Sequence, residues 1–512
     1  MHPSHHAKEF PNKPAYVMAA TGKAVDYATL EARSNRLAHY WRDQGLNVGD
    51  TVAIVLENHE WLFPLVWSAQ RSGLYYTCLS HTLSGEDLAY ILNDCGARIV
   101  VGSRKTLPLL RAAHDSGAQP TMVLVDGHEP DAPGLTAAVA QLPATPISDE
   151  MAGTDMLYSS GTTGRPKGVR KPIVPGEPID GQTPLMAVAR TRFGMGGDTI
   201  YLSPAPLYHA GPLRWAMLIQ RLGGTVIVMD RFDAERALEL IQTYKITASQ
   251  WVPTHFNRML QLDEDVRLKY DVSSMQIALH AAAPCPVPVK QAMIDWWGPI
   301  IHEYYGGTEN NGLTMISPEE WLSHRGSVGR AYIGALRVCD EEGNVLPARS
   351  EGAIYFEGGP KFTYHNDEAK TRSAYNSHGW STLGDIGWVD EEGYLYLTDR
   401  KSFMIISGGV NIYPQEIENM LTVHPKVADV AVIGAPDPDM GEKVVAVVQP
   451  RNWADAGPEL AQELRSYARE RLGGVKTPRQ IDFMEELPRE PTGKLFKRLL
   501  RDQYKSAAGA VA

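Results

Sequence analysis

Apolar residues in the first part of the chain follow two spacings, one typical of helices and one typical of buried strands. Residues 29–44 place four apolar side chains on one helical face, namely Leu30, Leu37, Ala38 and Trp41. Asp26 is a suitable N-cap before them, and Gly45 can end the helix. Residues 52–56 form a short apolar run, which predicts a buried strand. The same reasoning predicts helices at residues 60–73 and 86–93 and strands at residues 99–101 and 122–125.

Strands and helices continue to alternate in the middle of the chain. The pattern predicts strands at residues 199–202, 225–229 and 246–252 and a helix at residues 234–244. Alternation at this spacing indicates largely parallel sheets that helices cover on both faces. Residues 171–197 differ, because they carry Pro172, Pro175, Pro178 and Pro184 among several glycines. We interpret this segment as a long loop or an exposed insertion.

The sequence pattern changes after residue 341. Short strands between glycines, including residues 352–356 and 394–398, predict a small β-rich subdomain. The charged junction at residues 399–401 follows, and then a smaller α/β pattern predicts helices at residues 412–421 and 460–472 and strands at residues 427–433 and 444–449. We therefore expect an α/β protein with two domains, residues 1–399 and 400–512. The first holds parallel α/β subdomains and the β-rich subdomain, and the second is a small α+β domain.

Composition restricts the class of protein further. A chain of 512 residues is too long for one compact core, and 43% hydrophobic with 21% charged residues is ordinary for a soluble enzyme. The net charge of −11 disfavours nucleic acid, because phosphate backbones are held by clustered Lys and Arg. No apolar run approaches the roughly 18 residues that a spanning helix needs. Four cysteines lie far apart and suit a reducing cytoplasm, namely Cys78, Cys95, Cys285 and Cys339.

The two ends of the chain give expectations of their own. The N-terminus has no apolar leader segment, so we expect a protein that is not processed. His2, His5 and His6 could bind a metal ion, but a solvated, disordered end is the simpler interpretation. Residues 508–512 are expected to be a disordered tail.

Residues 158–169, YSSGTTGRPKGV, are the most informative stretch. Hydroxyl side chains, glycines and one lysine lie so close together that N–H groups, hydroxyls and an ammonium can surround phosphate oxygens. The stretch is not a Walker loop, because Pro166 and Gly168 on either side of Lys167 argue against a helix start. The short apolar residues 155–158 before it predict a loop between two strands. An ordinary glycine-rich surface turn is the alternative.

Other stretches contain candidate functional residues, and each of them also has a purely structural interpretation. In YGGTE, residues 305–309, Tyr305 offers a flat ring for adenine and Glu309 an oxygen ligand for Mg²⁺. A turn closed by an acidic helix cap would have the same sequence. The histidine of PLYHAG, His209, fits a ligand site or a packed, hydrogen-bonded side chain. The basic cluster that begins at Lys494 fits a phosphate-directed charge or a solvated helix face.

These stretches, in this order, resemble the adenylate-forming superfamily of acyl-CoA synthetases, luciferases and adenylation domains of peptide synthetases. The resemblance covers nearly the whole sequence. It implies Lys494, Glu309 and His209 as catalytic residues and a Mg²⁺ site at Glu309 and Thr162. It implies an ATP and AMP site made of Ser159, Ser160, Gly161, Thr162, Thr163, Gly164, Lys167, Ala282, Tyr305, Gly306, Gly307, Thr308, Asp385, Arg400 and Lys494.

The resemblance also implies sites for the other substrates. The acyl pocket would be lined by Tyr208, His209, Trp251, His280, Ala281, Tyr304 and Gly306. Coenzyme A would pass Ser407, Gly408 and Gly409, and Asp399 would be the hinge of a mobile C-terminal domain. Two places depart from the family pattern: His280-Ala281 stand where relatives usually have Ser-Gly, and Ser402-Phe403 where they commonly have Lys-Asp.

The function that the resemblance implies is that of an acyl-CoA ligase. A carboxylate would attack ATP to give acyl-AMP and pyrophosphate, and rotation about Asp399 would then exchange Lys494 for the CoA thiol. Acetate-activating relatives carry tryptophan at the position of Gly306, so a glycine there and the small Ala281 to Ala283 indicate a bulky apolar acid. Such an acid is a medium-to-long fatty acid or an aryl or alicyclic alkanoate.

The expected partners are therefore ATP, CoA and a small carboxylic acid, without nucleic acid or an integral membrane segment. The oligomeric state stays open at this point. Two other classes also remain open: a stand-alone adenylating enzyme that passes the acyl group to another acceptor, and a noncatalytic nucleotide-binding protein.

Overall fold

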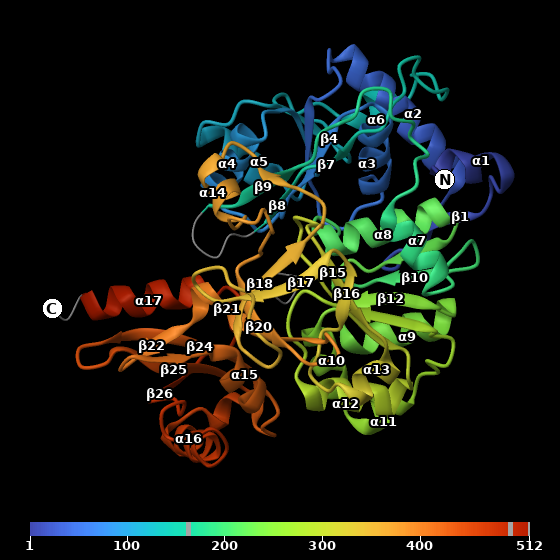
Figure 1. Ribbon diagram of the computed structural model, residues 1–512. Coiled ribbons are helices and arrows are strands. Elements are labelled where there is room, and N and C mark those ends of the chain that lie inside the picture. The colour runs from blue at the N-terminus through green and yellow to red at the C-terminus, as the bar shows by residue number, and fades with distance from the viewer. Residues whose placement is uncertain (160–164, 490–494, 510–512) are drawn as a thin grey trace. The chain divides into compact units, whose positions relative to one another are not determined.

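The structure is a computed structural model, and it describes residues 1–159, 165–489 and 495–509 (Figure 1). Contacts within the chain divide it into two compact units, which are described one at a time. Unit 1 comprises Met1–Trp251, Leu262–Leu279 and Phe362–Arg372, and unit 2 comprises Val252–Gln261, His280–Lys361 and Ser373–Ala512.

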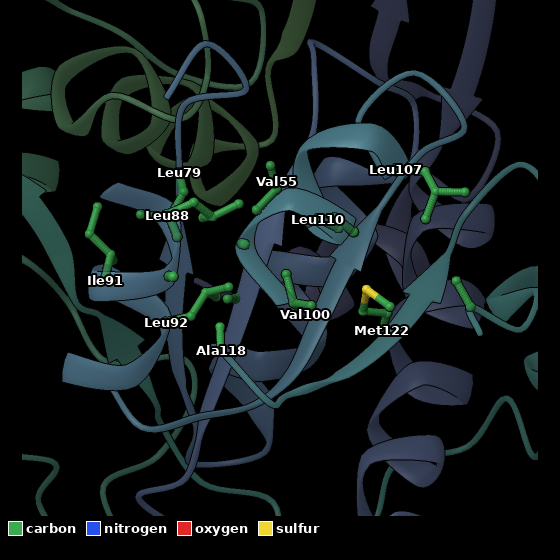
Figure 2. Packing of buried hydrophobic residues seen from close by; sticks show 14 of the residues in the cluster. Val55, Leu79, Leu88, Ile91, Leu92, Val100, Leu107, Leu110, Ala118 and Met122 are labelled. Atoms are coloured by element: carbon green, nitrogen blue, oxygen red, sulfur yellow. The ribbon is translucent and has the colours of Figure 1, made fainter. Parts of the chain in front are cut away.

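A five-stranded parallel sheet forms one half of unit 1. Its strands run in the order β6 (Thr121–Leu124), β5 (Ala97–Gly102), β3 (Thr51–Val55), β4 (Tyr75–Cys78) and β7 (Thr154–Asp155). Helices α4 (Gly85–Asp94) and α5 (Leu107–Asp115) pack on one face, where Leu88 and Leu110 meet Val100 and other buried apolar residues (Figure 2). The predicted parallel sheet is confirmed here.

A second set of strands in unit 1 runs in the order β12 (Ala248–Trp251), β10 (Ile200–Ser203), β11 (Thr225–Val228), β1 (Pro14–Met18) and β2 (Lys23–Asp26). All pair in parallel except β2. Helix α2 (Tyr27–Asp43) begins at Asp26, whose carboxylate accepts the N–H of Thr29, so the predicted N-cap is confirmed. Further elements of unit 1 are α3 (Leu62–Arg71), α6 (Leu135–Val139), α8 (Ala210–Leu222), α9 (Ala234–Tyr244), α11 (Glu264–Leu268) and most of β13 (Ile277–His280).

The expected disorder of the N-terminus is wrong. Helix α1 (Pro3–Glu9) begins there, and the His2 side chain caps it by accepting the N–H of Ser4. His2 and His6 are buried, with the His2 ring at 5.0 Å from the Trp67 ring and the His6 ring at 5.3 Å from the Tyr27 ring. Aromatic surface on α2 and α3 holds the end of the chain, which local sequence does not reveal.

The interpretation of residues 171–197 as a loop throughout is also wrong in part. Helix α7 (Pro184–Thr191) lies within the segment. Thr183 caps it through the N–H of Met186, and Pro184 stands in the first turn, where its missing N–H costs nothing. Buried Met186, Val188 and Ala189 give the helix an apolar face. The proline that argued for a loop therefore starts a helix.

Unit 2 begins with antiparallel strands. One set runs in the order β16 (Arg330–Ile333), β15 (Leu313–Ile316) and β14 (Ile301–Tyr305). A four-stranded sheet, β17 (Ala335–Cys339), β18 (Gly352–Glu357), β20 (Asp385–Val389) and β21 (Leu395–Arg400), is the β-rich subdomain that the sequence predicts. The helices of this part are α10 (Pro253–Leu260), α12 (Val287–Trp297) and α13 (Pro318–Ser323).

The C-terminal part of unit 2 is a sheet between two layers of helices. Strands β22 (Ile405–Ser407), β23 (Val410–Ile412), β24 (Val427–Asp437), β25 (Gly441–Pro450) and β26 (Gln480–Phe483) build it. Alternate residues of β24 and β25 face α15 (Pro414–Thr422) and α16 (Pro458–Leu472), and the residues between them face α17 (Lys497–Gly509) (Figure 1). Because α17 reaches Gly509, the tail predicted to be disordered is helical at its first two residues; residues 510–512 lie outside the described ranges.

None of the helices in the described ranges combines the length and the apolar character of a membrane-spanning segment.

Candidate functional site

The predicted loop between two strands is present in unit 1. Strands β8 (Leu157–Ser159) and β9 (Lys167–Arg170) pair antiparallel, and Ser159 stands opposite Lys167. Gly168 is required in this hairpin, because a Cβ there would lie 2.9 Å from the Tyr158 ring. Residues 160–164, on which five of the predicted nucleotide contacts fall (Ser160, Gly161, Thr162, Thr163 and Gly164), lie outside the described residues.

A distant segment completes this hairpin as a three-stranded sheet. Strand β19 (Thr363–Tyr364) pairs with β9, and the N–H of His365 donates to the Gly168 carbonyl at 2.8 Å. Lys167 Nζ lies 5.8 Å from the Tyr364 ring. Burial lowers the pKa of Lys167, and the charge of Lys370 lowers it further, although Asp367 opposes the shift.

The predicted acyl-side residues of unit 1 lie at the start of helix α8 and at the end of strand β12. His209 is the N-cap residue of α8, its carbonyl accepts the N–H of Leu213, and its ring lies 4.4 Å from the Tyr208 ring. Gly211 packs closely on Gln250, since a Cβ would lie 2.9 Å from its side-chain nitrogen. Trp251, at the end of β12, is fully buried.

Three predicted nucleotide residues of unit 2 meet at one carboxylate. The Tyr305 hydroxyl donates to Asp385 Oδ2 at 2.6 Å, and Arg400 Nε lies 3.1 Å from Asp385 Oδ1. Asp385 and Arg400 are opposite each other in the β20–β21 hairpin, which explains how residues 15 positions apart come together. Burial raises the pKa of Tyr305, and so does the Asp385 charge. Burial works against the charge of Arg400, but Asp385 and Tyr305 outweigh it, so its pKa is raised.

Glu309 has the geometry of a ligand that a magnesium ion could use. Its side chain is nearly buried, and a Cβ on Gly307 would lie 2.6 Å from Glu309 Oε2, so the carboxylate lies against a backbone that only glycine leaves open. A carboxylate oxygen suits Mg²⁺, and Glu309 therefore fits the ion that the resemblance implies. In the described ranges no group of three or more His, Cys, Asp or Glu side chains is placed to hold a metal.

The departure from the family pattern at residue 280 leads to a buried polar group that sequence reasoning missed. The His280 ring is fully buried, 5.5 Å from the Phe256 ring, with Nε2 at 3.3 Å from Glu303 Oε2. Lys290 Nζ lies 2.6 Å from the same oxygen and 4.9 Å from the Trp321 ring. Burial lowers the pKa of His280 well below its usual range, and Lys290 adds to this. A charged residue in an apolar strand, Glu303, was the available sequence clue.

The residues after His280 have little side chain to fill space. Ala281 is buried, whereas Ala282 and Ala283 are exposed. Ala282 has a φ of 76°, a left-handed conformation that costs an alanine about 1–2 kcal/mol. Gly306, at the end of β14, is exposed as well, and Tyr304 and Thr308 beside it are half-buried.

The predicted hinge and CoA residues lie in strands and in one tight turn, with Asp399 in β21, Ser407 at the end of β22 and the two glycines in the turn after it. Asp399 is nearly buried, and its Oδ2 accepts the N–H of Gln415 in the first turn of α15 at 2.9 Å. Gly408 and Gly409 link β22 to β23 as a two-residue turn, with φ of 57° and 79°. Both glycines are exposed and Ser407 is buried. Lys494 lies outside the described residues.

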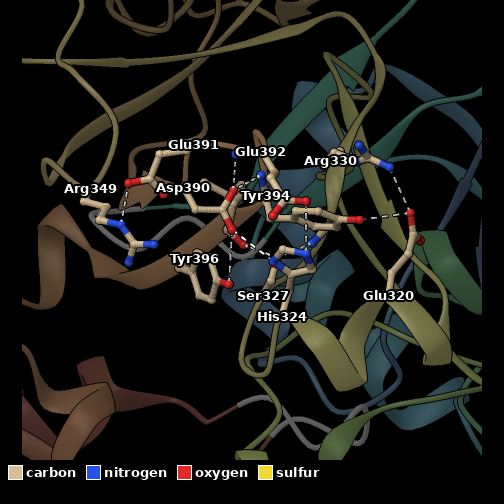
Figure 3. A network of polar contacts seen from close by, with 12 residues as sticks. Glu320, His324, Ser327, Arg330, Arg349, Asp390, Glu391, Glu392, Tyr394 and Tyr396 are labelled. Carbon is tan, nitrogen blue, oxygen red and sulfur yellow. Dashed lines mark hydrogen bonds and ion pairs between the residues drawn. The ribbon is translucent and has the colours of Figure 1, made fainter.

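A polar network braces the closed end of the hairpin that carries Asp385 and Arg400 (Figure 3). His324 Nδ1 lies 3.1 Å from Asp390 Oδ2, and its ring stacks on Tyr394 at 3.7 Å. Arg330 lies over the same tyrosine ring at 4.6 Å. Asp390 Oδ1 accepts the N–H of Tyr394 and so closes the turn. The hairpin is thereby held at the end away from Asp385.

Comparisons with known proteins agree with this geometry. The model of the AMP-binding enzyme family matches residues 4–362, and that of the AMP-binding enzyme C-terminal domain matches residues 416–494. The chain is 32% identical to long-chain-fatty-acid–CoA ligase FadD13 of Mycobacterium tuberculosis over 96% of each chain. It is 30% identical to feruloyl-CoA synthase of an Amycolatopsis species over 94% of each chain.

Solved structures match over the full length. ATP-bound MatB from Rhodopseudomonas palustris has a TM-score of 0.81 and 28% identity, over 99% of this chain and 100% of that one. o-Succinylbenzoate CoA synthetase (MenE) from Bacillus subtilis, in complex with its acyl-adenylate intermediate, has a TM-score of 0.79 and 26% identity, over 98% of this chain and 97% of that one.

Fold and site therefore define an adenylate-forming enzyme. The chain belongs to the AMP-binding enzyme family, which confirms the resemblance, the fold class and the enzyme class. It is an ATP-dependent carboxylate–CoA ligase that uses ATP, Mg²⁺ and CoA.

Proposed function

We propose that this ligase activates a bulky apolar carboxylic acid, a medium-to-long fatty acid or an aryl or alicyclic alkanoate, and releases AMP and pyrophosphate. The observation that carries the proposal is the row of residues without large side chains at the predicted acyl site, Ala281 to Ala283 and Gly306. Full-length relatives named for a long-chain fatty acid and for a ferulate, both large acids, support the same size class.

In the proposed first half-reaction, the hairpin from Ser159 to Lys167 holds the phosphates, and Tyr305, Asp385 and Arg400 hold the adenosine. Asp385 is suited to the ribose, because an ionised carboxylate accepts two neighbouring hydroxyl donors. Its orientation comes from Tyr305 and Arg400, which occupy one oxygen each. A Mg²⁺ ion at Glu309 would supply positive charge to the phosphate oxygens.

Lys494 is proposed to complete the adenylation site. A carboxylate and an α-phosphate repel each other at close range, so a cation aimed at the oxygens where charge develops lowers the barrier. In the second half-reaction, the domain of residues 400–512 is proposed to rotate about Asp399, withdraw Lys494 and bring Gly408 and Gly409 to the pantetheine arm. The exposed backbone of that glycine turn supports this role.

A second candidate function differs from the first only in the acceptor of the acyl group. The chain is 28% identical to a relative named fatty acid–[acyl-carrier-protein] ligase ScoC from Streptomyces coeruleorubidus, over 98% of this chain. A carrier protein in place of CoA is therefore the alternative acceptor. We include a cytoplasmic location in the proposal, which the free thiols of Cys78, Cys95, Cys285 and Cys339 support.

Pyrophosphate release with a panel of acids tests the proposal. The panel contains acetate, hexanoate, palmitate, cyclohexanecarboxylate, phenylpropionate and ferulate, each with and without CoA. We expect release with one or more of the bulky acids, little with acetate, and a thioester only when CoA is present. Preference for acetate would contradict the proposed substrate class, and acyl-AMP without thioester formation would favour the carrier protein.

A further inference from the structure

One amide side chain of unit 1 makes three hydrogen bonds to backbone groups that lie far from it in the sequence. Asn58 follows the end of strand β3 by three positions. Its Oδ1 accepts the N–H of Leu207 at 2.8 Å. Its Nδ2 donates to the carbonyl of Met229 at 2.6 Å and to that of Ala205 at 3.3 Å. One side chain thus holds the segment before α8 and the residue after β11 together.

The three partners of Asn58 are buried residues. Leu207 has no exposed surface, and Ala205 and Met229 have almost none. Backbone N–H and C=O groups in such places need a partner inside the protein, because water is a poor substitute there. The conformation of the segment before α8 therefore depends on the amide of Asn58.

This segment leads directly into two residues of the predicted acyl site. Leu207 precedes Tyr208, and the N–H of His209 donates to the carbonyl of Pro206 at 3.3 Å. The carbonyl of His209 in turn accepts the N–H of Leu213 at 3.0 Å in the first turn of α8. Asn58 thus fixes one side of a short turn, and α8 fixes the other.

The contacts of Asn58 lie where substrates are commonly bound in folds of this kind. Strands β3, β10 and β11 each end just before a residue of this network, and ligands of parallel α/β sheets bind beyond the carboxyl ends of the strands. His81, which follows the neighbouring strand β4, places its ring 5.7 Å from the Tyr208 ring, edge to face. The five-stranded sheet therefore supports the Tyr208 segment through two of its strand ends.

From these contacts we infer that Asn58 is a positioning residue for the acid substrate, which holds Tyr208 and His209 in the orientation that the acid requires. The inference rests on the acyl site proposed above. Residues that hold a side chain beside a substrate affect binding strongly, since a small displacement is enough to weaken it. The predicted adenosine contacts of Tyr305 and Asp385 belong to another part of the chain, so loss of Asn58 affects the acid and leaves AMP binding unchanged.

The test compares two variants at residue 58 with a matched control. Asn58→Ala removes all three hydrogen bonds, and Asn58→Asp keeps the acceptor for Leu207 but removes both donors. The control is Asn35→Ala. Asn35 is also buried in unit 1, donates to Glu31 Oε1 at 2.9 Å and to the carbonyl of Ala144 at 2.8 Å, and accepts from Arg71.

Three quantities are measured for each full-length variant. Mass spectrometry follows hydrogen exchange of the amides in residues 203–209 without any substrate. Pyrophosphate release gives the KM for the acid that the parent chain prefers. Calorimetry gives the dissociation constant of AMP, and urea unfolding gives the stability of each variant.

We expect Asn58→Ala to speed exchange in residues 203–209 and to raise the KM for the acid about tenfold, with the dissociation constant of AMP unchanged. Asn58→Asp should change the KM in the same direction, and it supplies the test if Asn58→Ala does not fold. Asn35→Ala should lower the urea midpoint, because it also loses three hydrogen bonds, but should leave exchange in residues 203–209 and the KM unchanged.

Three results would overturn the inference: an unchanged KM for the acid in both variants at residue 58, equal losses for the acid and for AMP, or the same rise in KM in Asn35→Ala. The choice of acid does not enter this comparison. A parent chain that prefers acetate would contradict the proposed substrate class, and the variants would then be compared with acetate and would still decide the role of Asn58.

Discussion

The hydroxyl of Tyr305 and the carboxylate of Asp385 lie 2.6 Å apart although 80 positions separate them in the chain. The bond joins the end of β14 to the start of β20, and Arg400 takes the other carboxylate oxygen at 3.1 Å. A residue predicted for adenine and two predicted for ribose are thus joined through one carboxylate.

Removing the Tyr305 hydroxyl tests what that bond contributes. Tyr305→Phe keeps the ring but releases Asp385 Oδ2, and loss of one orienting hydrogen bond costs about 1 kcal/mol, which is roughly fivefold in affinity. We expect that increase in the dissociation constant of AMP, measured by calorimetry. Asp385→Asn, which also weakens the contact with Arg400, should cost more. Equal affinities in parent and Tyr305→Phe would show that the bond does not orient the carboxylate.

The division of labour between the half-reactions is tested by Lys494→Ala. Because the ammonium is needed where the carboxylate meets the α-phosphate, we expect pyrophosphate release to fall by about 100-fold or more. Thioester formation from chemically supplied acyl-AMP and CoA should stay within a small factor of the parent rate. Lys497 is unsuitable as a control, because it pairs with buried Glu418 at 2.8 Å and its loss would disturb the fold. Arg498 is exposed, so Arg498→Ala is the control variant. An equal loss in both assays would end the assignment.

Much of the fold follows from local patterns in the sequence. The helix at residues 234–244 and the capped helix after Asp26 are correct because apolar periodicity and capping act within a few residues. Helix α1 was missed because what holds it, Trp67 and Tyr27, lies on other elements. The Pro-rich segment concealed α7 because proline both starts and interrupts helices.

The candidate site divides in the same way. Tyr305, Asp385 and Glu309 could be found because short motifs carry them. Lys290 could not, since its importance comes from Glu303, which it reaches only through the packing of α12 on β14. Short motifs indicate the residues that we propose to touch substrate, and tertiary contacts reveal the residues that support them.

Breaking the buried pair of Lys290 and Glu303 should destabilise the protein strongly. Lys290 is fully buried and Glu303 nearly so, and removal of one partner leaves a buried charge without compensation, which costs about 3–5 kcal/mol. We expect Lys290→Met to lower the free energy of unfolding by this amount, measured as a lower urea midpoint in equilibrium unfolding. The double variant Lys290→Met with Glu303→Leu should recover most of the loss, because it leaves no charge behind. A double variant as unstable as the single one would show that the loss of stability comes from altered packing and not from an uncompensated charge.

The docking of α1 should depend on pH through His2. Burial lowers the pKa of His2 well below its usual value, and the Arg71 and Arg221 charges lower it further. The unfolded chain therefore binds a proton that the folded chain does not, so this stability is present above about pH 6.5 and is lost as the pH falls. For each pH unit below that value, one such histidine lowers the free energy of unfolding by up to about 1.4 kcal/mol.

We expect limited proteolysis to cut between α1 and β1 faster at pH 5.5 than at pH 7.5. His2→Asn keeps a side chain that can cap α1 and cannot titrate in this range, so its cleavage rate should differ much less between the two pH values. His6, whose pKa burial also lowers, would account for a remaining difference, and His2→Asn combined with His6→Gln should remove it. A parent chain with the same cleavage rate at both pH values would show that neither histidine controls the docking of the helix.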